Sequence, residues 1–217
     1  MSPPVPTVRT GSNRCVAVID VGTNSIRIAI AEIDPAGQIR VIESLSQGVR
    51  LGKDTFIRGE IARSTMEDCV RVLKAYRKKL AEYQITRADQ IRVVATSAVR
   101  EASNRIAFVD RIYIATGFIV EPIDEPEVHR ITYRSIKQQL DAHSEFEDAR
   151  IAIAEVGGGS TELLYVDAGN VAYSHAFRIG SLRLHESLES LRATHSKLRD
   201  IMESEIHRKT PRLERSQ

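Results

Sequence analysis

The amino-acid sequence predicts an α/β protein made of two like domains that face each other across a cleft. One observation is a unit that occurs twice, starting near Val16 and near Ile151. The unit is an apolar run ending in a carboxylate, a turn of glycine and hydroxyl residues, and two further strand-like runs. A second observation is that amphipathic helical patterns follow or separate these runs. A repeat of this size indicates two similar domains, and the space between such domains is a usual ligand site.

The composition is that of an ordinary globular protein. The chain has 217 residues and a mass of 24.2 kDa, which suits one large domain or two small ones. Hydrophobic residues make up 42% and charged residues 28%, which excludes a disordered or fibrous chain. The net charge is only +2, so neither nucleic acid nor a membrane is the expected partner. Cys15 and Cys69 match no metal-binding spacing, and with no apolar signal segment the expected location is the cytoplasm.

The first domain is expected over residues 14–122, after a loose leader at residues 1–13. Short apolar runs separated by tight turns predict an antiparallel meander, and a long stretch with helical spacing predicts a helix after it. A strand, a second helix ending at Gly117 and a short strand closed by Pro122 complete the domain. The expected strands are Cys15–Asp20, Ile26–Ile33, Ile39–Ser46, Ile91–Thr96 and Phe118–Glu121, and the expected helices are Glu60–Tyr83 and Arg105–Thr116.

The second domain is expected over residues 123–217 and repeats the pattern. A helix leads through a polar loop into three strands, and charge-rich helical sequence follows before a frayed tail. The expected strands are Arg150–Glu155, Glu162–Val166 and Val171–Phe177, the expected helical stretches are Glu125–Leu140 and Leu182–His207, and the tail is Arg208–Gln217.

The two repeated turns carry the chemistry. Glycine lets a backbone turn sharply and approach a ligand closely, and successive backbone N–H groups then form a hollow that binds anions. Hydroxyl side chains add donors, and an acid before each turn holds a cation against phosphate oxygens. Either turn alone also fits a plain hairpin, but the pair predicts a cleft that binds a chain of phosphates from both sides. The predicted phosphate-binding residues are Gly22, Thr23, Asn24, Ser25, Gly157, Gly158, Gly159, Ser160 and Thr161, and the predicted metal-binding acids are Asp20 and Glu155.

Two further segments support an anion site. The run Val49–Gly52 places Arg50 beside a turn, and the run Ala95–Ala102 places hydroxyls and an arginine where a strand becomes a helix. Helix N-termini attract phosphate, and arginine binds it in a bidentate way. Arg50, Thr96 and Arg100 are therefore predicted to bind substrate, although each arginine taken singly also fits a surface charge.

These motifs together carry a family resemblance. The stretches are Ile19-Asp-Val-Gly-Thr-Asn-Ser25, Val49-Arg-Leu-Gly52, Ala95-Thr-Ser-Ala-Val-Arg-Glu-Ala-Ser-Asn104 and Val156-Gly-Gly-Gly-Ser-Thr-Glu162. They resemble the exopolyphosphatase / guanosine pentaphosphate phosphohydrolase family, which belongs to the actin, sugar-kinase and heat-shock chaperone superfamily. The resemblance covers about Arg14 to Leu188. It implies two actin-like (ribonuclease H-like) domains, with a mixed five-stranded sheet and helices in the first and a C-terminally incomplete second domain.

The resemblance also implies an activity. Family members remove a terminal phosphate from polyphosphate or from pppGpp, so polyphosphate and guanosine penta- or tetraphosphate are the expected partners. Mg²⁺, or Mn²⁺ in its place, is expected near Asp20 and Glu155. Phosphoryl transfer needs placement and charge neutralisation plus one group that orients water, and such a cleft supplies these.

The water-activating position departs from the family pattern. In the family a glutamate two residues before an arginine activates the water, and here that position is Val128, two residues before Arg130. Glu127 is the expected catalytic residue, but one helical residue is about 100° of rotation, so it serves only if the helix start is shifted or unwound at Pro126. Glu125 and His129 are weaker substitutes, and Glu155 replaces the family's aspartate. A catalytically degenerate phosphate-chain or nucleotide sensor is therefore the alternative function.

The second domain is also shorter than the resemblance implies. The strand near Arg150–Glu155 would then be an unprotected edge, and such edges pair with something. The expected explanations are that the chain is a fragment of a longer protein, that it forms a homodimer, or that the helix at Leu182–His207 covers the edge. Kinases and chaperones of the superfamily hold adenosine with late second-domain loops, so an ATP-dependent kinase is disfavoured.

Overall fold

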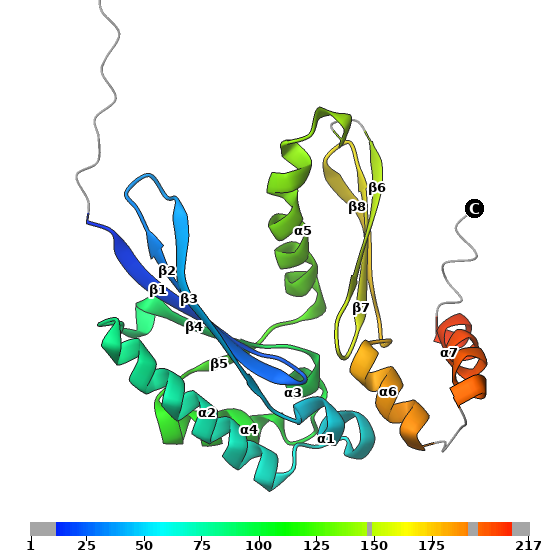
Figure 1. Cartoon of the computed structure of the whole chain (residues 1–217), viewed down its shortest axis with the longest axis horizontal. Helices are drawn as coiled ribbons and strands as arrows, with labels where there is room; N and C mark the ends of the chain where they lie inside the picture. The colour runs from blue at the N-terminus through cyan, green and yellow to red at the C-terminus, as the bar shows by residue number, and fades with distance from the viewer. Residues whose placement is uncertain (1–11, 147–148, 191–194, 210–217) are drawn as a thin grey trace, which may run out of the picture.

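The protein is α/β, as predicted, with one sheet in each of two lobes. A computed structural model describes residues 12–146, 149–190 and 195–209 of the chain. In Figure 1 the blue-to-green part of the chain forms one lobe, and the green-to-yellow part forms the second lobe beside it. The glycine turns lie where the two lobes approach each other, so the fold matters mainly for how it brings these turns together.

The first sheet has five strands in the order β3-β2-β1-β4-β5. The predicted meander is confirmed, because β1 pairs antiparallel with β2 and β2 pairs antiparallel with β3. β4 and β5 continue the sheet in parallel beyond β1, and this makes it the predicted mixed five-stranded sheet. The strands are β1 (Arg14–Val21), β2 (Ser25–Ile33), β3 (Ile39–Gly48), β4 (Ile91–Ala95) and β5 (Val120–Pro122).

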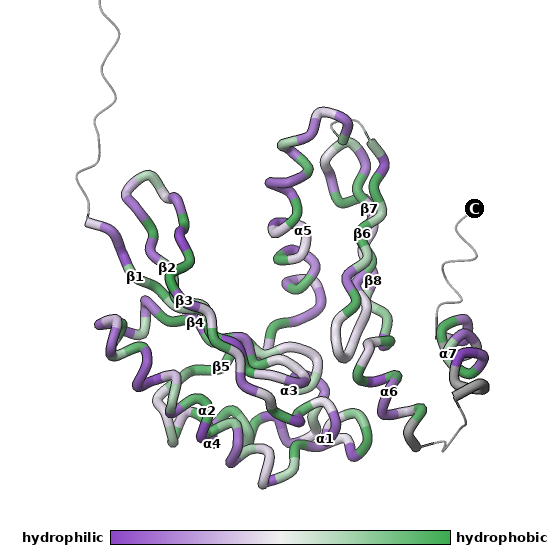
Figure 2. Tube along the Cα trace, in the orientation of Figure 1, coloured by the Kyte–Doolittle hydropathy of each residue, from purple (hydrophilic) through white to green (hydrophobic). Residues whose placement is uncertain are grey.

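Two helices cover one face of this sheet and close its core. Helix α2 (Arg63–Glu82) packs against α4 (Arg105–Thr116), and both lie below the sheet in Figure 1. Leu73 of α2 and Phe108 of α4 are fully buried together with sheet residues such as Ile28. Figure 2 shows hydrophobic and hydrophilic residues alternating along these helices, which is typical of helices with one buried face.

The sequence missed a short helix next to the first glycine turn. Instead of a plain turn at Val49–Gly52, helix α1 (Leu51–Arg58) begins inside this stretch. Gly52 weakens the helical signal, yet it is buried where an added Cβ would lie 2.6 Å from Leu182 of the second lobe. Contact between the lobes therefore explains a glycine in the first turn of this helix. A second short helix, α3 (Ser97–Glu101), follows β4, and single-turn 3₁₀ helices occur at Ala88–Gln90 and Ser144–Phe146.

The second sheet has three antiparallel strands in the order β6-β7-β8. The strands are β6 (Arg150–Val156), β7 (Thr161–Asp167) and β8 (Asn170–Phe177), and helix α5 (Glu125–Asp141) packs on β7 and β8. Leu164 and Val166 of β7 are completely buried. Within the described residues β6 pairs only with β7, so the predicted edge strand is present.

The helical sequence after β8 forms two helices, α6 (Ser181–Ser190) and α7 (His195–Lys209). α6 packs against α1 of the first lobe and lies below β7 and β8 in Figure 1. The expectation that this stretch covers the β6 edge is therefore not met by α6. Of the predicted leader (residues 1–13) and tail (residues 208–217), residues 1–11 and 210–217 lie outside the described residues, and α7 extends to Lys209. None of the described helices combines the length and apolar character that a bilayer crossing requires.

Candidate functional site

The two glycine turns line one cleft of about 650 Å³. The prediction that the turns converge is thus met by the geometry, since residues of both lobes surround the same space. The predicted residues that line it are Asp20, Gly22, Thr23, Asn24, Ser25, Thr96, Arg100, Glu155, Gly157, Gly158, Gly159 and Ser160. Three predicted residues are not among the lining residues: Arg50, Glu127 and Thr161.

Two backbone hydrogen bonds hold the first turn in place. The N–H of Gly22 donates to the carbonyl of Ser25 at 3.0 Å, which closes the turn between β1 and β2. The N–H of Gly52, in the first turn of α1, donates to the carbonyl of Thr23 at 2.7 Å. In a trans peptide the N–H and C=O point in opposite directions, and the described residues contain no cis peptide. The N–H of Asn24 therefore points away from α1, on the side opposite the carbonyl of Thr23.

The second turn repeats this arrangement. The N–H of Gly157 donates to the carbonyl of Ser160 at 2.9 Å, as the equivalent glycine does in the first turn. Backbone N–H groups at the start of α6 bind the carbonyls of Gly157 and Gly158, and Nε of Arg183 donates to the carbonyl of Gly159 at 2.8 Å. The N–H groups of Gly158, Gly159 and Ser160 consequently point the other way, and they donate to no acceptor within the described ranges. Three successive donors of this kind form an anion-binding hollow.

Glycine is required here because the lobes touch, which the sequence did not reveal. An added Cβ at Gly158 would overlap the hydroxyl of Thr23 in the first turn. At Gly159 it would overlap the hydroxyl of Ser97 and lie 2.6 Å from Cζ of Phe56. The second turn therefore packs directly on the first lobe.

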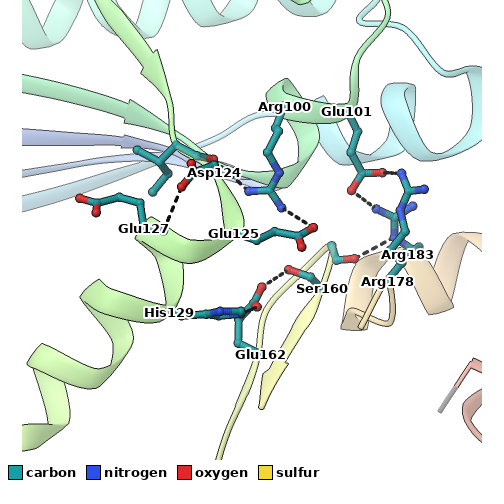
Figure 3. Close-up of polar contacts among 12 residues, drawn as sticks. Arg100, Glu101, Asp124, Glu125, Glu127, His129, Ser160, Glu162, Arg178 and Arg183 are labelled. Carbon is teal, nitrogen blue, oxygen red and sulfur yellow. Dashed lines mark hydrogen bonds and ion pairs between the residues drawn. The ribbon is translucent and has the colours of Figure 1, made fainter. Parts of the chain in front are cut away.

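An ion-pair cluster fixes this contact. Arg183 on α6 pairs with Glu101 at the end of α3 at 2.7 Å, and the two side chains are only 14% and 16% exposed. The Arg183 guanidinium lies over the ring of Phe56, 3.9 Å from its centroid. Arg178 pairs with the second oxygen of Glu101, as Figure 3 shows. Because Arg183 also binds the carbonyl of Gly159, the cluster ties the second turn to the first lobe.

Carboxylates from both lobes reach the cleft. Asp20 stands at the end of β1, and burial raises the pKa of its carboxyl, while the positive charge of Arg27 acts in the opposite direction. Glu155 stands near the end of β6, where the Thr132 hydroxyl donates to its Oε2 at 2.5 Å. Glu162 at the start of β7 is the third, and its residue exposure is only 4%.

The donor set suits a hard cation bound together with phosphate. No group of three metal-binding side chains is found among the residues that the structure describes. Mg²⁺ does not need one, because it commonly takes one or two carboxylates and fills its shell with water and substrate phosphate oxygens. Asp20 and Glu155, one from each lobe, therefore fit the predicted role.

The raised pKa of Asp20 predicts a stability effect. The folded protein holds the Asp20 proton more tightly than the unfolded chain, so this group's contribution to stability is present at acid pH and is lost as pH rises through the folded pKa. Asp20→Asn should therefore raise the urea midpoint of the metal-free protein at pH 7, and the gain should disappear at acid pH. The exposed Asp110→Asn serves as control, and equal midpoints for Asp20→Asn and wild type at pH 7 would contradict the argument.

The first turn of α5 does not bring a carboxylate into the cleft. Val128 lines the cleft, at the position where the family resemblance implies a glutamate. The carboxylate of Glu127 instead binds Nε of Arg130 at 2.6 Å and lies 4.0 Å from Arg92. Figure 3 shows Glu127 pointing away from Glu162 and Ser160. The helix begins at Glu125 without unwinding, and Asp124 caps it by accepting from the N–H of Glu127, so the shift that would rescue Glu127 is absent.

Glu162 is held in place by hydrogen bonds from two sides. The Ser160 hydroxyl donates to Oε1 at 2.8 Å, and Nε2 of His129 lies 2.7 Å from Oε2. The side chains of His129 and Glu162 are 11% and 5% exposed, so the pair is shielded from bulk water. His129 is the residue next to Val128, which means that α5 still supports a carboxylate in the cleft through a neighbour.

The predicted cationic residues are divided between two places. Arg100 lines the cleft, where its Nη1 donates to the carbonyl of Ile123 at 3.0 Å and its Nη2 lies 3.7 Å from Glu125. Arg50 lines a neighbouring cavity instead. Thr161 turns its hydroxyl away and donates to the carbonyl of Ile179 at 2.5 Å. The cleft residues that sequence reasoning missed include Arg27, Glu162, Ser181 and His185.

The fold and the cleft together define a class: a two-lobed α/β protein in which a pair of glycine turns, one from each lobe, lines a common cleft. The model of the Ppx/GppA phosphatase family matches residues 29–210. The chain belongs to this family, and its lobes are the predicted actin-like domains, the second being present only in part.

Relatives and solved structures agree with this assignment. Exopolyphosphatase 2 of Mycobacterium tuberculosis is 31% identical over 179 residues, which is 79% of this chain and 54% of the relative. A bifunctional 3-dehydroquinate synthase/phosphatase of Fusobacterium nucleatum is 28% identical over 78% of this chain and 26% of its own length. The crystal structure of an exopolyphosphatase from Cytophaga hutchinsonii matches with a TM-score of 0.71 and 28% identity, over 80% of this chain and 53% of that one. A Ppx/GppA family member from Aquifex aeolicus matches with a TM-score of 0.66 and 28% identity, over 81% and 55%. The chain thus spans about half the length of most of these proteins, and a quarter of the bifunctional one.

Proposed function

We propose that this chain binds the terminal phosphates of linear phosphate anhydrides in the cleft and hydrolyses the end group. The observation that carries the proposal is the pair of turns whose backbone N–H groups face one space from two lobes. A condensed phosphate chain presents oxygens on all sides, so it can be bound by both turns at once. The relatives named as exopolyphosphatases support inorganic polyphosphate as the substrate class.

Each part of the cleft has a role in this proposal. The amides of Asn24, Gly158 and Gly159 hold phosphate oxygens, and the guanidinium of Arg100 neutralises their charge. Asp20 and Glu155 hold Mg²⁺, for which Mn²⁺ is a substitute, and the ion would supply further neutralisation of phosphate charge. Positioning and electrostatic stabilisation are the main requirements of phosphoryl transfer.

The attacking water needs a group that orients it and accepts its proton. Glu162 is the carboxylate that the geometry favours, because it lines the cleft, is buried, and is fixed by Ser160 and His129. Glu127 does not reach the cleft, so the role that the sequence assigned to it is not proposed again. His129 acts on the reaction through Glu162 and is a positioning residue.

The direct test is a phosphate-release assay with Mg²⁺ present and absent. We expect release from long-chain polyphosphate that depends on Mg²⁺ and stops on addition of a chelator. A parallel assay with pppGpp decides between the two family substrates. Absence of release from both substrates at high protein concentration would contradict hydrolysis by this chain.

Val128 favours a second candidate function, a catalytically degenerate sensor of phosphate chains. A sensor needs the turns but no group that activates water, and Val128 removes the group that the family resemblance implies at this position. In that case polyphosphate binds without turnover.

Val128→Glu separates the two functions. If the native chain is a degenerate enzyme, the substitution should raise phosphate release by about 10²-fold, the usual effect of a positioned proton acceptor. If Glu162 already accepts the proton of the attacking water, the substitution should leave the rate unchanged or lower it, because the new carboxylate would lie close to that of Glu162. Ile131→Glu, an exposed position on the same helix, is the control for added charge. A large increase with Val128→Glu alone would overturn the assignment of Glu162.

A further inference from the structure

A second cavity of about 690 Å³ adjoins the cleft at Asn24, which lines both spaces. It lies between α1, the start of α2 and the end of β3. Three cationic side chains line it: Arg50, Lys53 and Arg58. Arg50 is the arginine that the sequence predicted to bind substrate, and this cavity is where the structure places it.

The N-terminus of α2 opens into the cavity without a cap of its own. Its N-cap residue is Ala62, which has no side-chain acceptor, and no side-chain capping hydrogen bond is present. The first N–H groups of a helix have no acceptor inside the helix, and the dipole of a 20-residue helix adds positive potential there. Ser64 and Thr65 of this first turn line the cavity. The helix thus presents amide donors to the same space as the three cations.

Thr65 supplies an independent sign of a ligand. The residue is only 7% exposed, it lines the cavity, and its hydroxyl has no hydrogen-bond partner among the described residues. Oγ1 of Thr65 is not among the fully buried unpaired atoms, so the hydroxyl is open to the cavity, where a bound acceptor can take its hydrogen bond. The hydroxyl and the amides of the first turn are all donors suited to an oxyanion.

The carboxylates that line the cavity already have partners. Asp54 accepts a hydrogen bond from the N–H of Ala62 at 3.1 Å, and Asp68 pairs with Arg71. Lys53 lies 3.7 Å from Glu186, whereas no ion pair is found for Arg50 or Arg58 within the described ranges. The cationic side chains that line the cavity therefore outnumber the carboxylates. The groups still available to a ligand are hydrogen-bond donors, namely Arg50, Arg58 and the N–H groups at the start of α2, and these suit an anion.

We propose that this cavity is a second phosphate-binding site. The inference rests on the proposed function. A polyphosphate chain whose end lies between the glycine turns would extend past Asn24, and one of its more distant phosphates would then contact Arg50, Arg58 and the start of α2. The chemistry it recognises is a phosphate oxyanion, whose source is either the same long chain or free inorganic phosphate. If the phosphate in this cavity belongs to the bound polyphosphate chain, the protein binds long polyphosphate more tightly than short polyphosphate.

The first experiment compares the binding of tripolyphosphate and long-chain polyphosphate by calorimetry. Thr65→Val removes the hydroxyl at nearly constant volume, and Arg58→Ala removes one cation. Each should weaken long-chain binding about fivefold more than tripolyphosphate binding, the effect of losing one hydrogen bond or one phosphate contact. Thr55→Val is the matched control, since its buried hydroxyl is also unpaired but lies outside the cavity. Equal losses of affinity for tripolyphosphate and for long-chain polyphosphate would contradict the proposal that the cavity binds a distant phosphate of the long chain.

The second experiment observes the site itself. The amide resonances of Ser64 and Thr65 in the ¹⁵N-labelled protein are followed during titration with orthophosphate and with long-chain polyphosphate. Shifts with orthophosphate that Thr65→Val abolishes support a site for free phosphate, and shifts with the long chain alone support the chain as ligand. If neither orthophosphate nor long-chain polyphosphate shifts these resonances, the proposal of a second phosphate-binding site is wrong. Tripolyphosphate shifts at Gly158 and Gly159 report the cleft separately, so failure of this inference is distinguishable from failure of the proposed function.

Discussion

Glu162→Gln should lower the rate of phosphate release strongly while leaving the binding of polyphosphate nearly unchanged. The amide keeps the size of the side chain and can still accept from Ser160, but it cannot take a proton from water. Loss of a positioned general base costs about 10²-fold to 10⁴-fold in rate. The measurement is kcat for Mg²⁺-dependent phosphate release, with calorimetry to confirm that the protein still binds the chain.

Glu127→Gln is the matched control for this experiment. It makes the same chemical change at the residue that the sequence pattern favoured, whose carboxylate pairs with Arg130 outside the cleft. We expect its rate to stay close to wild type. A large loss with Glu127→Gln and none with Glu162→Gln would show that α5 rearranges and that the sequence assignment was right.

Gly159→Ala should have the second large effect, through the contact between the lobes. The new methyl group would meet Cζ of Phe56 at 2.6 Å and the Ser97 side chain, and the Phe56 ring has little freedom because Arg183 lies over it. Relief requires the lobes to separate, and overpacking of this kind costs about 2 kcal/mol. A shift of the amides by about 1 Å lowers activity about 10²-fold. Rate and unfolding midpoint should therefore both fall.

Gly48→Ala is the control for replacing a glycine. Its added Cβ meets nothing within 4 Å, and the residue lies at the end of β3. We expect wild-type activity from this variant. If Gly159→Ala is also fully active with an unchanged midpoint, the lobes do not hold the turns together as described.

The sequence predicted the fold through its periodic elements. The apolar run before each glycine turn, the meander and the amphipathic helix now seen as Arg63–Glu82 all carry strong local patterns, and the structure contains each of them. Helix α1 was missed because Gly52 interrupts the helical pattern, and the reason for that glycine is Leu182, which lies far away in the sequence. Contacts between the lobes leave no periodic signal in one chain.

The site was predicted through its backbone but less well through its side chains. A glycine turn after an apolar strand predicts anion-binding amides from local sequence, and most of the predicted turn residues line the cleft. Glu127 lies outside the cleft because the direction of a helical side chain depends on where the helix begins, and the Asp124 cap sets the start of α5. Glu162 could have been found, because it is in phase with Leu164 and Val166, and a charge at such an inward position needs a partner.

The amide resonances of the two turns test the central claim most directly. Tripolyphosphate is titrated with Mg²⁺ into the ¹⁵N-labelled protein, and the signals of Asn24, Gly158 and Gly159 are followed. One ligand bound between the lobes should shift the signals of both turns together, with a single affinity. Shifts confined to one turn, or different affinities for the two, would show that the turns do not hold a common phosphate chain.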